Sequence, residues 1–154
     1  MDVLLIHEFP QYADQCCDLI NLEWPRSKTA RMRSLEMSCD TLPTSLILVN
    51  SGKVIGHSKL SQIPSIPSGC FIESVVIHPE FRGKGLGKFL MMKTEEYIQS
   101  LGLETAYLST IDKQEFYSKL GYIECEKISI YGGMINSISN SKKKLPFLQT
   151  LLNY

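Results

Sequence analysis

Paired cysteines, clustered histidines and unbalanced charge are all missing from this sequence, and each absence argues against a class of protein. The five cysteines are an odd number and contain no C-x-x-C spacing, so the sequence predicts reduced thiols and no disulfide framework. The three histidines have no Cys or His neighbours at ligand spacing, which predicts no metal site. Sixteen acidic residues balance sixteen basic ones, which argues against broad nucleic-acid or polyanion binding.

Long apolar runs and a basic leader are also missing. The first apolar run follows the acidic Asp2 and is only four residues long, so neither a signal peptide nor a membrane span is expected. With 154 residues, 44% of them apolar, the chain can build one globular domain with a proper core but not two. We therefore expect a cytoplasmic, monomeric, single-domain protein over residues 1–154.

The pattern of apolar and turn-forming residues predicts a mixed α/β fold. Apolar residues at a helical period predict helices at 10–25, 27–38, 86–101 and 113–120, with Ser27 and Asp112 as N-caps. Strand patterns fall at 3–6, 43–50, 53–61, 71–77, 103–108, 122–130 and 145–154. The strand at 103–108 should run parallel to that at 71–77, because the helix between them serves as a crossover. The polar segment 132–144 reads as a mobile loop.

The segment 71–92 contains the strongest functional signal. An apolar strand ends at Pro79, and a glycine-rich turn then feeds a helix. Glycines let successive backbone N–H groups converge on a ligand, and the start of the helix adds partial positive charge, so the turn suits a phosphate-bearing cofactor. A P-loop would need Ser or Thr after Lys88, and a dinucleotide fingerprint would need glycine at that position. The alternative is a strand-to-helix turn with incidental glycines.

Four cations lie within eight residues in the segment that follows Trp24: Arg26, Lys28, Arg31 and Arg33. Positive charge near a helix N-terminus opposes the helix dipole, so this placement is mildly unfavourable unless an anion is close by. The cluster indicates an acidic ligand, although a solvated basic face would have the same composition.

Two motifs in order resemble the GNAT acyltransferase superfamily. The first is Arg82-Gly-Lys-Gly-Leu-Gly87, and the second is Phe116-Tyr-Ser-Lys-Leu-Gly-Tyr122. The resemblance covers essentially the whole chain. It implies a mixed central sheet of about six to seven strands with four helices, splayed between two central parallel strands. It also implies acetyl-CoA as the cofactor.

The stretch from Asp18 to Leu35, which contains Trp24-Pro-Arg-Ser-Lys-Thr-Ala-Arg31-Met-Arg-Ser34, is similar to the N-alpha-acetyltransferase family that modifies processed actin N-termini. Substrates of that family begin with Asp or Glu, which suits the basic cluster. The resemblance implies an actin N-terminus as partner and substrate-binding roles for Trp24, Arg26, Arg31, Met32, Arg33, Ser34, Ser109 and Thr110. Profilin is left open, because this sequence lacks the long proline-rich insertions of some family members.

The same resemblance implies the cofactor contacts. These are backbone groups of the strand before the loop and amides or side chains of the loop: Val75, Val76, Ile77, Arg82, Gly83, Lys84, Gly85, Leu86, Gly87 and Lys88, together with Tyr117. An N–H of Val75 or Val76 would stabilise the oxyanion of the thioester. The side chains of Arg82 and Lys84 could equally be surface residues without a cofactor contact.

Tyr117 occupies the general-acid position of the family, or else packs and hydrogen-bonds the cofactor. No strong base is evident, which leaves Glu73 or a water relayed through Ser109 or Thr110. An α-amine, with a pKa of about 7.7 to 8.0, needs less help than lysine at about 10.4, which favours N-terminal acetylation.

Several alternatives share parts of this evidence. The same fold could acetylate a small-molecule amine or lysine, and a catalytically silent acyl-CoA-binding or actin-binding module would be a different class. Trp24 could pack in the core or line the peptide entrance. The segment 132–144 could border the same groove through Lys142, Lys143 and Lys144, or be a solvated tail.

Overall fold

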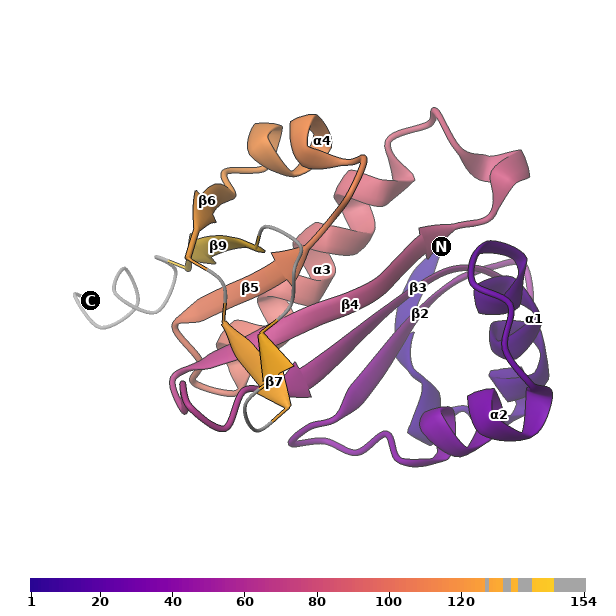
Figure 1. Cartoon of the computed structure of the whole chain (residues 1–154). Coiled ribbons are helices and arrows are strands. Elements are labelled where there is room, and N and C mark those ends of the chain that lie inside the picture. The colour runs from indigo at the N-terminus through magenta and orange to yellow at the C-terminus, as the bar shows by residue number, and fades with distance from the viewer. Residues whose placement is uncertain (127, 132–133, 136–139, 146–154) are drawn as a thin grey trace, which may run out of the picture. The chain divides into compact units, whose positions relative to one another are not determined.

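The computed structural model describes residues 1–126, 128–131, 134–135 and 140–145 (Figure 1). Seven strands form one sheet in the order β1-β2-β3-β4-β5-β9-β6, and β7 pairs with β8 in a separate two-stranded ribbon. The chain divides into two compact units, which we describe in turn. The strands β3 (Lys53–Gln62) and β4 (Gly69–Ile77) and the helix α3 (Leu86–Ser100) each contribute residues to both units.

Unit 1 comprises Met1–Leu60 and Ser74–Thr94. It contains β1 (Asp2–Leu5), β2 (Thr44–Asn50), α1 (Ala13–Glu23) and α2 (Lys28–Glu36), with single turns of 3-10 helix at Ile6–Glu8, Pro10–Tyr12 and Pro79–Phe81. The strands β1 and β3 both pair with β2 in antiparallel ladders. The β2–β3 turn uses positive φ at Ser51 (49°) and Gly52 (77°), as a two-residue hairpin turn requires.

The central strand of unit 1, β2, is buried on both faces because each face packs on a different set of helices. Ile47 and Val49 belong to a cluster with apolar residues of α1 and α2, while Leu48 belongs to a cluster with Leu90 of α3. The alternation of side chains along a strand produces this division. Figure 1 shows α1 and α2 together beside β2 and β3.

The second helix begins where the sequence predicts. Ser27 lies in an extended conformation, and its Oγ accepts a hydrogen bond from the backbone N–H of Ala30 at 3.2 Å. That geometry satisfies one of the free N–H groups at the start of α2. The predicted cap is therefore confirmed.

Unit 2 comprises Ser61–Glu73 and Glu95–Tyr154. Its described elements are β5 (Thr105–Ser109), α4 (Gln114–Lys119), β6 (Ile123–Cys125), β7 (Ser129–Tyr131), β8 (Met134–Ile135) and β9 (Asn140–Lys144). The strands β4 and β5 are parallel, with register from Gly69↔Thr105 to Ile72↔Leu108. The predicted parallel pair around a helical crossover is thus confirmed.

The C-terminal part differs from the sequence-based expectation. The segment 132–144 is not wholly a loop, because β8 and β9 lie in it and β9 pairs antiparallel with both β5 and β6. The predicted strand at 122–130 is instead two short strands, β6 and β7. Of the predicted final strand at 145–154, only Leu145 lies within the described residues.

The cap of α4 is also different from the prediction. Lys113, and not Asp112, is the N-cap residue, and its side chain makes no capping hydrogen bond. The hydroxyl of Thr110 accepts a hydrogen bond from the Lys113 N–H at 3.0 Å and so performs this role from outside the helix. Among the described residues, no helix is long and apolar enough to cross a bilayer.

Candidate active site

The glycine-rich loop of unit 1 is open at the positions where a ligand backbone would approach. Gly83 and Gly85 have φ of 77° and 78°, and a Cβ added at either residue would meet no atom within 4 Å. The α-helix that follows begins at Leu86 and runs for 15 residues. Free N–H groups of its first turn and left-handed glycines before it make a cradle for a phosphate group.

The cations of this loop have different surroundings. Arg82 donates from Nε to the carbonyl oxygen of Ile77 at 2.8 Å and from Nη2 to Glu23 Oε2 at 3.3 Å. Lys84 lies over the ring of Phe81, with its Nζ 5.2 Å from the ring centroid. Lys88 is exposed and makes no ion pair with a described residue. Arg82 therefore helps to fix the loop on its own unit, whereas the exposed ammonium groups of Lys84 and Lys88 are accessible to an external anion.

The strand before the loop has an unusual backbone at Ser74, where φ is 54°. A single left-handed residue in a strand interrupts the ladder, and the regular register with β5 extends only to Ile72. Beyond Ser74, the side chain of Val76 joins the cluster under α1 and α2, while Val75 and Ile77 join the cluster with α3. The N–H of His78 then donates to the Ile55 carbonyl oxygen at 2.7 Å.

The connection between α1 and α2 is held by Arg31. Its Nη2 donates to the carbonyl oxygen of Trp24 at 2.6 Å, and its Nε donates to Asn21 Oδ1 at 3.1 Å. Burial and the neighbouring charge of Arg26 lower the pKa of Arg31 below its ordinary value. The side chain of Trp24 is 42% exposed, so it is not a core residue.

The other residues of the basic segment have separate environments. Arg26 and Arg33 are exposed and make no hydrogen bond or ion pair with a described residue. Lys28 pairs with Asp14 at 3.0 Å, with both side chains exposed. Met32 packs against the core cluster of α1 and α2, and Ser34 accepts a hydrogen bond from Lys59 Nζ at 3.0 Å. Of the predicted cations, Arg26 and Arg33 are the ones available to an external anion.

In unit 2, Tyr117 lies on α4 with its ring buried among aromatic neighbours. Its ring meets those of Phe116 and Tyr122 edge to face, at centroid distances of 5.0 and 5.8 Å. Its hydroxyl makes no hydrogen bond with a described residue. Burial, with a smaller effect from Asp112, raises the pKa of Tyr117 to about 12. The phenol therefore stays protonated at neutral pH and can donate.

Glu73 and Ser109 come directly after Ile72 and Leu108, which are the last residues that pair β4 with β5. Phe71 is opposite Tyr107, and the period of two places Glu73 and Ser109 on the same sheet face as that pair. Glu73 Oε1 accepts a hydrogen bond from Ser61 Oγ at 3.3 Å. The Oγ of Ser109 is the one buried side-chain polar atom without a hydrogen-bond partner among the described residues. An unsatisfied buried hydroxyl is unfavourable unless a ligand or water completes it.

Comparison with known proteins places this geometry in a family. The Acetyltransferase (GNAT) family matches residues 13–122. The chain belongs to the GNAT acetyltransferase family. The family membership means that the acetyl donor is acetyl-CoA, and the open glycines and free helix N-terminus of the loop fit its pyrophosphate.

Individual relatives narrow the comparison. N-alpha-acetyltransferase 80 of Mus musculus is 36% identical over 120 residues, which cover 73% of this chain and 38% of that protein. Glucosamine 6-phosphate N-acetyltransferase of Trypanosoma brucei brucei is 36% identical over 77 residues, which cover 47% of this chain and 52% of that protein. The chain therefore spans only 38% and 52% of the length of these two relatives.

Solved structures show the same fold. An aminoglycoside 6'-N-acetyltransferase complexed with coenzyme A superposes with a TM-score of 0.75 at 20% identity, covering 94% of this chain and 97% of that one. A second aminoglycoside 6'-acetyltransferase, type Ii, has a TM-score of 0.74 at 23% identity over the same shares of the two chains. At this identity, the likeness supports the mixed α/β GNAT architecture alone.

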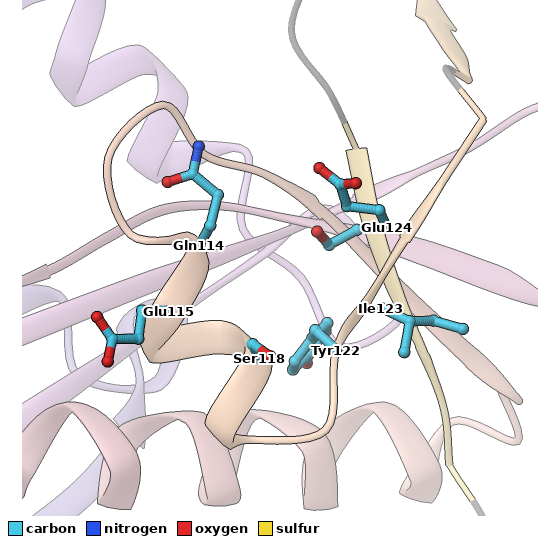
Figure 2. Close-up of a pocket in the computed structure, with 7 residues that line it drawn as sticks. Gln114, Glu115, Ser118, Tyr122, Ile123 and Glu124 are labelled. Carbon is cyan, nitrogen blue, oxygen red and sulfur yellow. The ribbon is translucent and has the colours of Figure 1, made fainter.

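A pocket of about 440 Å³ lies in unit 2, and its lining includes Ser118 and Tyr122 of the second motif (Figure 2). Figure 2 shows its labelled side chains coming from α4, from Tyr122 just before β6, and from β6 itself. The lining residues are Gln114, Glu115, Ser118, Tyr122, Ile123, Glu124 and Ser141. Two carboxylates in this set make the pocket unsuited to the phosphates of a GNAT acetyl donor.

Sequence reasoning missed one buried group close to the predicted cofactor strand. His57 on β3 is 1% exposed and lies 2.8 Å through Nδ1 from the Ser74 carbonyl oxygen. No local sequence pattern predicts the role of His57, because its hydrogen-bond partners lie on other strands. His7, in contrast, contacts Ser38 and Asp40 at 2.8 and 2.7 Å. His7, Glu8 and Asp40 form the one group with metal-ligand spacing among the described residues, and Glu8 and Asp40 are exposed.

Proposed function

We propose that this chain transfers the acetyl group of acetyl-CoA to the N-terminal amine of a protein that begins with Asp or Glu, such as processed actin. The observation that carries the proposal is the exposed segment between α1 and α2. There Arg31 bonds the backbone carbonyl oxygen of Trp24, the Trp24 side chain is exposed, and Arg26 has no partner among the described residues. An unpaired guanidinium two residues from an exposed indole suits a peptide with carboxylates near its amine. The similarity to N-alpha-acetyltransferase 80 supports the same acceptor class.

Most of the residues proposed to bind acetyl-CoA lie in unit 1. In unit 1, backbone groups of Val75, Val76 and Ile77 would bind the pantetheine arm and the thioester carbonyl. The amides of residues 83–88 would hold the pyrophosphate, with added charge from Lys84 and Lys88. An N–H of Val75 or Val76 directed at the carbonyl oxygen would stabilise the negative charge that develops there.

Unit 2 supplies the proposed proton-handling groups. Tyr117, whose pKa is raised to about 12, would donate a hydrogen bond or a proton to the departing thiolate, which has an ordinary pKa of about 8.5. Glu73 would accept the proton of the attacking amine, or the hydroxyl of Ser109, which has no partner among the described residues, would orient a water that takes it. Thr110 is less suited to this role, because its hydroxyl already accepts from Lys113.

The proposal is tested by measuring CoA release with four acceptors. These are a peptide beginning Asp-Asp, one beginning Glu-Glu, a basic histone-like peptide, and glucosamine 6-phosphate as an anionic small amine. We expect kcat/KM to be at least about tenfold higher for the two acidic peptides, which corresponds to about 1.4 kcal/mol of differential transition-state binding. A preference for either of the other acceptors would overturn the proposal. Actin and actin with profilin are the natural protein substrates to compare next.

The alternative of a catalytically silent module is separated by the same assay. The open glycine loop and the protonated Tyr117 both support turnover. We propose that residues 1–154 act as one catalytic domain, and acetylation by this chain alone is the matching test. Binding of CoA without turnover on any acceptor would contradict both proposals.

A further inference from the structure

Three consecutive residues of β4 carry the proposed backbone contacts to acetyl-CoA, and both ends of this segment are bonded to β3. At the far end, the His78 N–H donates to the Ile55 carbonyl oxygen at 2.7 Å. At the near end, the Ser74 carbonyl oxygen accepts from the side chain of His57 at 2.8 Å. The near end uses a side chain because Ser74 has left the regular strand conformation, with φ of 54°.

A serine in the left-handed region is strained, so its surroundings must hold it there. The Ser74 carbonyl oxygen meets the side chain of His57 there. A carbonyl oxygen that faces the interior needs a donor to avoid the penalty of an unsatisfied buried acceptor. Among the described residues, His57 is the side chain bonded to it.

The tautomer of His57 follows from its partners. A carbonyl oxygen can only accept, so Nδ1 carries the proton and donates it to Ser74. The Nε2 atom then accepts from the Ser45 hydroxyl, 3.3 Å away. Burial lowers the pKa of His57 to about 4 despite the hydrogen bond to Ser74. The ring is therefore neutral at physiological pH, with one N–H to donate.

Ser45 is itself fixed in place. Its backbone N–H donates to Ser38 Oγ at 3.0 Å, and Ser45 is 1% exposed. The contacts Ser38–Ser45–His57–Ser74 thus form one row across β2, β3 and β4 inside unit 1. A group held on both sides in this way has a single orientation, which is the requirement for positioning a backbone segment.

We propose that His57 is a positioning residue for the acetyl donor: its Nδ1–H holds the Ser74 carbonyl so that the backbone of residues 75–77 is presented to acetyl-CoA. The inference rests on the proposed cofactor role of that segment. His57 touches neither substrate and acts through Ser74, while Ser45 keeps its donor nitrogen pointed at β4.

Two substitutions of similar polarity at His57, to Asn and to Gln, distinguish a positioning role from a packing role. The amide nitrogen of Asn can occupy the place of Nδ1, whereas the longer Gln places its amide near Nε2. His57→Asn retains the donor to Ser74, His57→Gln places it toward Ser45, and His57→Leu removes it. Ser58→Ala is a matched control, because it deletes a buried 2.8 Å hydrogen bond from the neighbouring residue of β3 to Thr94.

The experiment measures the dissociation constant of CoA by calorimetry and the hydrogen exchange of the amides of residues 75–77, with circular dichroism to confirm folding. We expect His57→Leu and His57→Gln to weaken CoA binding about tenfold and to speed exchange in this segment. His57→Asn should remain within about threefold of the wild type, and Ser58→Ala should leave CoA binding unchanged.

The outcomes separate this inference from the proposed function. Wild-type protein that binds no CoA would overturn the cofactor role of the segment. If folded His57→Leu binds CoA as tightly as the wild type does, the positioning role alone is overturned. If His57→Asn and His57→Leu weaken CoA binding equally, the positioning role is also rejected, because the hydrogen-bond donor that Asn retains would then make no difference. If His57→Leu does not fold, the comparison of His57→Asn with His57→Gln decides the question.

Discussion

Arg31 Nη2 lies 2.6 Å from the carbonyl oxygen of Trp24 and thereby closes the connection between α1 and α2. The guanidinium spans seven residues of chain and also reaches Asn21 on α1. Arg31, which the sequence assigned to substrate binding, thus uses its guanidinium for hydrogen bonds within its own unit. In the proposed function, its contribution would be to shape the segment that carries Trp24 and Arg26.

Replacement of Arg31 should therefore reduce stability. We expect Arg31→Ala to lose about 1.5–3 kcal/mol in urea unfolding, because two hydrogen bonds to a charged group disappear. Arg31→Lys should recover little, since an ammonium cannot reproduce the fork that bonds both partners. Arg33→Ala, on the same helix and exposed, should change stability by no more than about 0.5 kcal/mol. Equal effects of the two alanine variants would contradict this role.

Arg26 is expected to behave in the opposite way. Arg26→Glu should leave the melting temperature nearly unchanged, because the side chain is exposed and makes no bond to a described residue. The KM for an Asp-Asp peptide should rise about tenfold, with the KM for acetyl-CoA within about twofold. Steady-state kinetics with each substrate varied in turn measure both constants. A matching rise in the two KM values would remove Arg26 from the acceptor site.

The glycine loop offers an internally controlled test. Gly83, Gly85 and Gly52 have nearly equal φ values, and a Cβ at any of them meets open space. Alanine at each position should cost about 1 kcal/mol of stability through backbone strain alone. We expect only Gly83→Ala and Gly85→Ala to raise the KM for acetyl-CoA, since Gly52 lies in the β2–β3 turn. Similar KM changes in all three would show that strain and not phosphate contact is responsible.

The lone hydroxyl of Ser109 predicts a split between stability and activity. Ser109→Ala removes a buried polar atom without a described partner, so the ligand-free protein should be as stable as wild type or more stable by up to about 1 kcal/mol. If the hydroxyl handles the amine proton or its water, kcat should fall by about tenfold or more. Thermal melts and kinetics on the same preparations measure both quantities. Unchanged kcat would exclude Ser109 from the reaction.

His57 also predicts how stability depends on pH. Its pKa is depressed in the folded state from 6.5 to about 4, first by burial and also by the charges of Lys59 and Arg31. The unfolded chain binds a proton below pH 6.5 while the folded chain does not, so stability is full above pH 6.5 and falls as the pH drops toward 4. The loss attributable to this group is about 3 kcal/mol. His57→Asn should lack this part of the dependence in urea titrations between pH 7 and 4, and an identical slope would contradict it.

Much of the fold is predictable from local sequence. Ser27 caps α2 because a hydroxyl at that position reaches an N–H three residues on. The turn at Gly52 and the end of α3 before Gly102 follow from left-handed backbone that glycine adopts without strain. The two GNAT motifs are likewise local, since each is a short run of residues whose spacing alone carries the signal.

The polar segment 140–144 shows why the C-terminal part could not be predicted. Its sequence, Asn-Ser-Lys-Lys-Lys, has little tendency to form a strand, yet β9 pairs with β5 on one side and β6 on the other. Two ladders of backbone hydrogen bonds override weak intrinsic preference. Lys143 also reaches Glu95 at 2.8 Å, 48 residues away.

The sequence by itself determined the helices, most strands, the glycine-rich loop and the acetyltransferase family, because each depends on residues within one turn or one motif. Tertiary structure alone decided which cations have no partner among the described residues. It also decided which histidine is bonded to the strand proposed to bind the cofactor. Arg31 and His57 acquire their roles from Trp24, Ser45 and Ser74, and no spacing along the chain encodes that a neighbouring strand will place a carbonyl 2.8 Å from a ring nitrogen.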